Sequence, residues 1–205
     1  MLKINPKLLF CFFLFLVISF GCCEAQLEKQ FFLTADQKSI IPYQTNETLN
    51  FITNTGYAFT LKVDSVFTFM ARESLGEESC LYYEYETIEA CLSSVHPELK
   101  ITISSTALHD FNEISLYNFN LSVNNKYFRI NNNNDYDSFI QHSFRDTTIL
   151  NHSYSDVWIF ELGFDFTLND DSLAFWFDKI IYSKEHGIEL ITFTNNDYYE
   201  LEDNK

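Results

Sequence analysis

Apolar and polar residues alternate along much of this chain, and this alternation constrains its fold more than any other feature. The pattern is strictest over residues 117–123, where Tyr, Phe, Leu and Val occupy every second position and Asn or Ser lies between them. A period of two is typical of a β-strand that buries one face. Aromatic residues make up 18% of the chain, and their rings bury large areas. The sequence therefore predicts strands around an aromatic core.

Similar strands recur about every 8 to 14 residues, with short polar turns between them. The segment 49–63 predicts a hairpin around the turn 54–56, and a change of phase near Val66 interrupts the alternation that follows. Further strands are predicted in the C-terminal third, at 157–166, 173–182, 188–193 and 198–201. We therefore expect an all-β fold, a single antiparallel meander domain that forms either a barrel or a two-sheet sandwich.

The segment 88–95 fits two patterns. Its apolar residues at 88, 91, 92 and 95 are spaced as on one face of a helix. Those at 88, 90 and 92 are spaced as on one face of a strand. The β-branched and aromatic residues that flank the segment favour the strand.

The N-terminus has the features of an export signal. Lys3 and Lys7 precede an apolar run, residues 8–20, which ends at Gly21-Cys22-Cys23. The run is shorter than the roughly 20 residues that cross a bilayer. A small residue directly before a cysteine is typical of bacterial lipoproteins, which are cleaved there and acylated on that cysteine. The sequence therefore predicts lipidation of Cys22.

Two alternatives to lipidation remain open. Cleavage after Ala25 would release a freely secreted protein, and an uncleaved segment would act as a signal anchor. The favoured interpretation divides the chain into a lipoprotein signal peptide (1–21), a polar tether (22–38) and an antiparallel β domain (39–205). It places the protein at the cell envelope, on a membrane surface, held by more than one acyl chain.

The charge of the mature chain limits its partners. Removal of residues 1–21 leaves 11 basic and 29 acidic residues, a net charge of −18. Nucleic acid and anionic lipid both require positive protein surface, so neither is an expected partner. The acidic residues are scattered along the chain, which is typical of a solvated surface.

Cys80 and Cys91 are the two cysteines of the predicted domain, and an exported protein can oxidise them. A disulfide between them requires Cα atoms within about 7 Å. Eleven residues of continuous strand would hold them about 36 Å apart. The bond therefore requires a chain reversal near Tyr85-Glu86, and free thiols are the alternative.

No known catalytic or metal-binding motif occurs in the chain. It contains no HExxH pair, no GxSxG elbow and no glycine-rich phosphate loop. The run 133–137 carries oxygen ligands at alternate positions but lacks the glycine and the terminal glutamate of an EF-hand loop, so it predicts a hydrated turn. We therefore expect no catalytic residue, no cofactor and no metal.

Two segments resemble small uncharacterised lipoproteins of the Bacteroidota. Residues 41–56, IPYQTNETLNFITNTG, are similar to the proline-containing entry and first hairpin of those proteins. Residues 182–188, YSKEHGI, are similar to their closing hairpin. The resemblance implies an envelope lipoprotein with a β domain. It implies no reaction.

The expected function is therefore a non-enzymatic binding or scaffold domain that meets a protein, a glycan or an apolar ligand at the envelope. A lipocalin-like carrier of an apolar ligand is one alternative, because a closed barrel can hold one. An envelope hydrolase with a carboxylate pair is another. The interior discriminates among them: a filled core favours a scaffold, a deep aromatic cavity a carrier, and paired buried carboxylates an enzyme.

Overall fold

The computed structural model describes residues 24–76, 79–109, 115–124, 126–130, 144–161 and 177–202, and most of them lie in strands. The predicted all-β fold is confirmed. The elements are β1 (Gln26–Phe31), α2 (Ala35–Ser39), β2 (Thr48–Thr53), β3 (Ala58–Ser74), β4 (Leu81–Ser94), β5 (Leu99–His109), β6 (Ser115–Val123), β7 (Lys126–Ile130), β8 (Arg145–Ile149), β9 (His152–Glu161), β10 (Phe177–Ser183), β11 (Gly187–Phe193) and β12 (Tyr198–Leu201).

The strands form one continuous sheet in the order β7-β6-β5-β4-β3-β2-β12-β11-β10-β9-β8. Every neighbouring pair along this path is antiparallel, and most neighbours are consecutive in the chain, as in a meander. The exception is β2, which pairs with β12 and so joins the two ends of the chain in the middle of the sheet. Within the described residues the outermost strands, β7 and β8, do not pair with each other.

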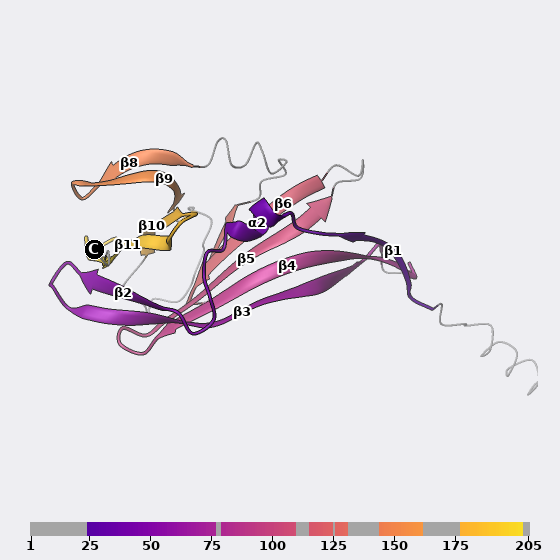
Figure 1. The fold of residues 1–205 in the computed structure, drawn as a ribbon, viewed down its shortest axis with the longest axis horizontal. Coiled ribbons are helices and arrows are strands. Elements are labelled where there is room, and N and C mark those ends of the chain that lie inside the picture. The colour runs from indigo at the N-terminus through magenta and orange to yellow at the C-terminus, as the bar shows by residue number, and fades with distance from the viewer. Residues whose placement is uncertain are drawn as a thin grey trace, which may run out of the picture.

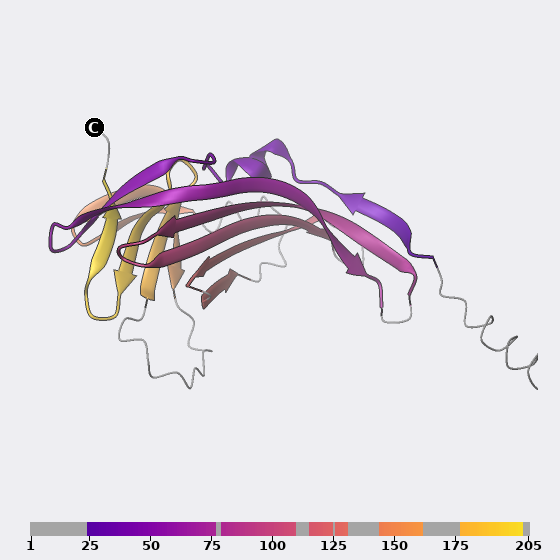
Figure 2. The ribbon, with the colours of Figure 1, turned by 90° about the horizontal axis from the view of Figure 1, so that it is seen from below.

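The sheet folds over so that its two halves face each other. Figure 1 shows β8–β11 on one side of the molecule and β2–β6 on the other, and Figure 2 shows the C-terminal strands running across the long direction of β3–β5. Phe119 of β6 joins the halves, with its ring centroid 5.1 Å from that of Trp158 on β9 and 5.3 Å from that of Tyr182 on β10. The folded sheet therefore encloses the aromatic core predicted from the alternation.

The first hairpin follows its local sequence. β2 and β3 pair around a turn in which Gly56 has φ +82°, a conformation that favours glycine. The register of β3 against β4 shifts between Val63 and Ser65, which is the change of phase expected near Val66. This β-bulge returns Val66 to the core side, opposite the buried Ala90. The ambiguous segment 88–95 lies in β4 up to Ser94, so the strand prediction is confirmed there.

The N-terminal segment differs from the expected free tether. From Gln26 onward it belongs to the fold, because β1 pairs in parallel with β4. The chain then enters α2, where Thr34 and Gln37 form a capping box and Leu33 is buried. Residues 26–38 therefore cannot act as a flexible spacer between an anchor and the domain.

The C-terminal half contains the strands expected there, with boundaries shifted by a few residues. Trp158 and Phe160 of β9 point into the main core, as a buried aromatic face requires. Val157, on the opposite face, packs in a second cluster with Tyr154, Ile181 and Leu190. Trp176, the strand expected near Phe139 and the run 133–137 lie outside the described residues.

Candidate functional site

The junction between the halves of the sheet is closed by the segment that contains α2. Tyr182 of β10 donates its hydroxyl to the Ile40 carbonyl at 2.6 Å, and Ser105 of β5 donates to the Gln37 carbonyl at 3.4 Å. Ile40 is fully buried. One short helical segment thus connects β5 in the first half of the sheet with β10 in the second.

Glu86 of β4 holds the beginning of the same segment. Its carboxylate accepts the Leu33 backbone N–H at 2.9 Å and forms an ion pair with Lys38 at 2.6 Å. The Glu86 side chain is 11% exposed and that of Lys38 is 39% exposed. A buried carboxylate is stable when its oxygens are hydrogen-bonded in this way, so this contact is structural.

Tyr43 packs directly against Gly187 in the junction. The Ile188 backbone N–H donates to the Tyr43 hydroxyl at 2.7 Å, and a Cβ placed on Gly187 would overlap the Tyr43 ring. Gly187 also has φ +74°, so both the space and the backbone require glycine. Burial raises the pKa of Tyr43 and of Tyr182 well above the ordinary tyrosine value. Both phenols therefore remain neutral hydrogen-bonding groups.

A pocket of about 330 Å³ lies at the rim beside this junction. Its lining residues come from the entry to β2, the β10–β11 turn and the end of β12, and are Pro42, Tyr43, Glu47, Thr48, Leu49, Asn50, Glu185, His186, Leu201 and Glu202. Three of these side chains are carboxylates. The pocket thus suits a polar or cationic group rather than an apolar ligand.

The pocket residues do not form an arrangement that we can recognise as catalytic. Glu185 and Glu202 are exposed, and the Gln44 backbone N–H holds Glu47 at 2.8 Å. Glu185 and His186 approach only to 3.9 Å, with both side chains largely in solvent. In the described part of the chain, no group of three or more His, Cys, Asp and Glu residues could hold a metal ion.

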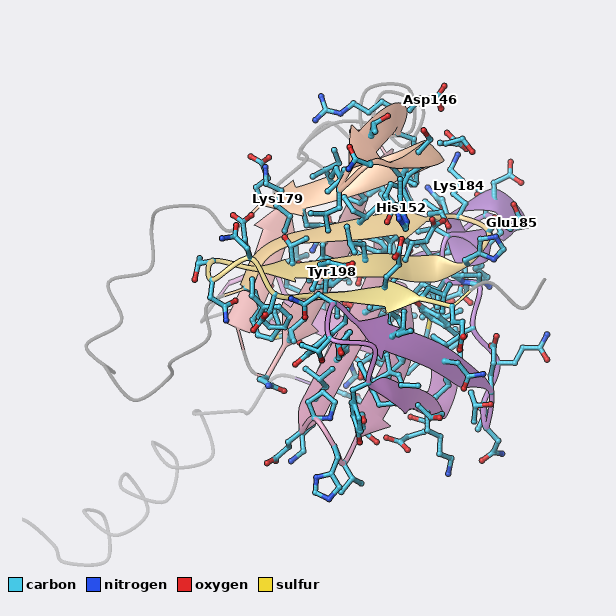
Figure 3. All side chains as sticks on the ribbon, turned by 90° about the vertical axis from the view of Figure 1, so that its left-hand side faces the viewer. Asp146, His152, Lys179, Lys184, Glu185 and Tyr198 are labelled. Carbon is cyan, nitrogen blue, oxygen red and sulfur yellow. The ribbon has the colours of Figure 1, made fainter. Side chains whose placement is uncertain are left out.

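A second polar group lies on the outer face of the C-terminal strands. Glu200 of β12 accepts a hydrogen bond from the Tyr154 hydroxyl at 2.8 Å and also contacts His152 Nδ1. Figure 3 shows His152 and Tyr198 over this face, with Glu185 at one end and Lys179 at the other. Burial and the Glu200 carboxylate raise the pKa of Tyr154, so its hydroxyl acts as a hydrogen-bond donor that ties β9 to β12.

The two cysteines of the domain do not pair with each other. Cys80 is disulfide-bonded, whereas Cys91 carries a free thiol. Of the two alternatives left open by the sequence, the bond between Cys80 and Cys91 does not form, because β4 runs without reversal through Tyr85 and Glu86, and free thiols hold for Cys91 alone of the two. Burial raises the pKa of the Cys91 thiol, and its Sγ lies 3.6 Å from Glu89 Oε1. Cys22, the predicted lipidation site, lies outside the described residues.

Tyrosines of β4 make contacts within the protein. Tyr85 is 5% exposed and stacks on Phe31 of β1, with 5.4 Å between ring centroids. Tyr82 packs against the Arg72 guanidinium at 4.0 Å. Exposed aromatic rings occur instead on β3, where Phe67 and Phe69 are 43% and 40% exposed.

The junction residues were not predicted from the sequence as a site. Thr34 and Gln37 form a recognisable capping signature, which could have placed α2. Nothing local links Tyr43 to Gly187, which lie far apart in the chain.

Comparison with protein families, with curated proteins and with solved structures found no match. Among the described residues no helix is long and apolar enough to span a bilayer.

Proposed function

We propose that this chain is a cell-envelope lipoprotein, anchored through lipid on Cys22, whose β domain serves as a non-enzymatic binding or scaffold module. The observation that carries the proposal is the sequence at the N-terminus, an apolar run that follows two lysines and ends at Gly21-Cys22. The membrane is then the first partner, and a protein or glycan at the envelope is the second.

The packing of the core supports a scaffold over a carrier. Phe119, Trp158 and Phe160 contact one another, with centroid distances of 4.2 to 5.8 Å, so their rings fill the space between the halves of the sheet. A carrier would need that space for its ligand. The solvent-facing carboxylates of the rim pocket likewise favour binding over hydrolysis, which requires an opposed pair of carboxyl groups.

Intact mass of the mature N-terminus tests the anchor. The full-length chain is produced in a bacterial host that processes lipoproteins, alongside Cys22→Ala and a matched control, Cys91→Ala. We expect wild type and the control to begin at residue 22, to carry acyl chains and to partition with membranes, whereas Cys22→Ala carries no acyl chain. An unacylated wild-type product that begins at Gln26 contradicts the proposal.

A further inference from the structure

The C-terminal half of β3 has an edge that no described strand covers. β2 pairs with β3 only from Ala58 to Lys62, whereas β4 pairs with it on the other side as far as Ser74. From Val66 onward, no described strand pairs with the side of β3 that faces away from β4. Figure 1 shows this part of β3 along the lower border of the sheet, with β4 above it. We call this side of residues 66–74 the open edge.

Two hydrogen bonds show how the backbone of this segment is oriented. At its beginning, the Val66 N–H donates at 2.9 Å to the side chain of Thr45, in the segment that leads into β2. At its end, the Leu75 N–H donates at 3.1 Å to the Leu81 carbonyl, at the start of β4. The two N–H groups therefore point to opposite sides of the strand.

The residues between them follow from alternation. The register of β3 against β4 runs without a shift from Ser65 onward. In an antiparallel ladder, the backbone groups of successive residues point to opposite sides. Thr68, Met70 and Arg72 therefore direct their N–H and C=O groups out of the open edge, where no described strand pairs with them. An exposed row of this kind is a template for a further strand.

Two aromatic rings line one face of the open edge. Phe67 and Phe69 are both exposed, and their stacked rings lie 5.6 Å apart. A strand added at this edge would place every second side chain on that face, beside the two rings. It would therefore bury apolar surface as well as pair the backbone groups.

The same face carries acidic side chains. Glu89 of β4 lies opposite Phe67, and alternation places Glu73 on this face of β3. Neither carboxylate forms an ion pair with another described residue. Arg72, on the opposite face, is paired with Glu84 at 3.2 Å. The charges thus favour a strand that brings basic side chains, whereas a second copy of this acidic chain would be repelled.

We propose that the open edge of β3 is a strand-addition site for an extended, basic segment of another protein, in which apolar and polar residues alternate. The backbone ladder supplies affinity, and the two phenylalanine rings and the carboxylates select the segment. The inference rests on the proposed function in one respect, since it names the class of partner that the binding module takes. It does not depend on the anchor at Cys22.

A designed peptide tests the site on the purified mature protein. Its sequence is Lys-Thr-Val-Thr-Val-Thr-Val-Thr-Lys, which reads alike in both directions and so suits a parallel or an antiparallel ladder. It is blocked at both ends and labelled, and binding is followed by fluorescence anisotropy. The control peptide has glutamate in place of both lysines. We expect the lysine peptide to bind about tenfold more tightly or better, with a difference that shrinks in high salt.

Two substitutions of one residue separate the backbone from the side chain. Met70→Pro removes an outward N–H that does not bond to β4, so the β3–β4 ladder keeps its hydrogen bonds. Met70→Ala is the matched control, because it shortens the side chain and keeps the N–H. We expect Met70→Pro to weaken binding of the lysine peptide by about tenfold or more, and Met70→Ala by less than about threefold.

A second variant keeps the test decisive if Met70→Pro does not fold. Phe67→Ser combined with Phe69→Ser leaves the backbone unchanged and removes both rings from the face. It should weaken binding by about fivefold or more. Tyr57→Ser is its control, because Tyr57 is an exposed ring at the β2–β3 turn, away from the open edge. It should leave binding unchanged.

The outcomes separate this inference from the proposed function. Equal binding by wild type and Met70→Pro, equal binding of the two peptides, or no binding up to about 1 mM peptide overturns the inference. Self-association of the protein that Met70→Pro abolishes in sedimentation also overturns it, and makes a second copy the occupant. None of these results bears on the acylation of Cys22. An unacylated chain that binds the lysine peptide through this edge supports the inference and contradicts the anchor.

Discussion

Two regions of the sheet are built from the same alternating pattern and end up in different environments. The body is the region where the halves of the sheet face each other, and Phe119 there is 2% exposed. The arm consists of β1 with residues 67–74 and 81–87, and Figure 1 shows it extending away from the C-terminal strands. Phe67 in the arm is 43% exposed. The difference arises because Phe119 faces the second layer of strands, whereas Phe67 lies on the other face of the sheet, next to Val66, which points to the core side.

The comparison shows what a period of two establishes. Alternation indicates a strand, and it indicates which residues share a face. It gives no information on whether another strand will cover that face, which depends on pairs such as β2 with β12 that are distant in the chain. In the arm, β4 gains a neighbour along its edge from β1. This strand lies near the N-terminus, whereas β12 lies near the C-terminus, so this pairing too is distant in the chain.

The largest effect is expected from Gly187→Ala, at the junction of the body. The added Cβ overlaps the Tyr43 ring, strains a residue at φ +74° and disturbs the bond from the Ile188 N–H. We expect a loss of roughly 5 kcal/mol of unfolding free energy, or failure to fold.

Gly56→Ala is the matched control, because φ there is +82° but a Cβ meets nothing within 4 Å. It should cost about 1–2 kcal/mol, measured by denaturant unfolding. Equal losses at the two glycines would contradict the contact.

Truncation of one ring in each region tests the comparison directly. Phe119→Ala removes a ring that contacts both β9 and β10, and should cost about 3–5 kcal/mol. Phe67→Ala removes a ring that stacks only on its neighbour Phe69 among the contacts of the arm, and should cost less than about 1 kcal/mol. Similar losses for the two variants in a urea titration would mean that Phe67 is buried as well as Phe119, which contradicts the comparison.

A smaller effect is expected at Glu86, which fixes the segment before α2. Glu86→Ala leaves the Leu33 N–H without its acceptor and Lys38 without its ion pair, and should cost about 2–3 kcal/mol. Glu86→Gln retains an acceptor and should cost less. The control is Glu161→Ala, whose partner Lys179 lies 3.0 Å away on a solvent-facing surface. Its loss should be below about 0.5 kcal/mol. The idea fails if Glu161→Ala is as destabilising as Glu86→Ala.

The smallest effect expected, per pH unit, is a loss of stability at alkaline pH. Folding raises the pKa of Tyr43 and Tyr182, so the folded chain keeps two protons that unfolded phenols lose near pH 10. The stability from these groups is complete below that pH and falls as the pH rises, by up to about 1.4 kcal/mol per pH unit for each tyrosine. Unfolding free energies between pH 8 and 11 should show this slope, and Tyr182→Phe should reduce it. An unchanged slope in that variant would contradict the assignment.

Local sequence predicted those parts of the fold that depend on neighbouring residues. It placed the β2–β3 hairpin, the bulge near Val66 and the bounds of β12, because turn residues and alternation are local. It missed β1, because Gln26–Phe31 is mostly polar and exposed and pairs with a strand more than fifty residues away. It also missed the junction between Tyr43 and Gly187, since their contact exists only after the sheet has folded over.

The parallel pairing of β1 has a mechanical consequence. The first residue of β1 lies at the far tip of the arm, and the C-terminal end of the described chain lies at the opposite side of the molecule (Figure 1). Tension applied to Gln26 along the strand would act in shear and stress the bonds of the β1–β4 ladder together, whereas an antiparallel hairpin pulled at its open end would unzip one bond after another. A module tethered by this end would therefore resist being stretched away from its surface.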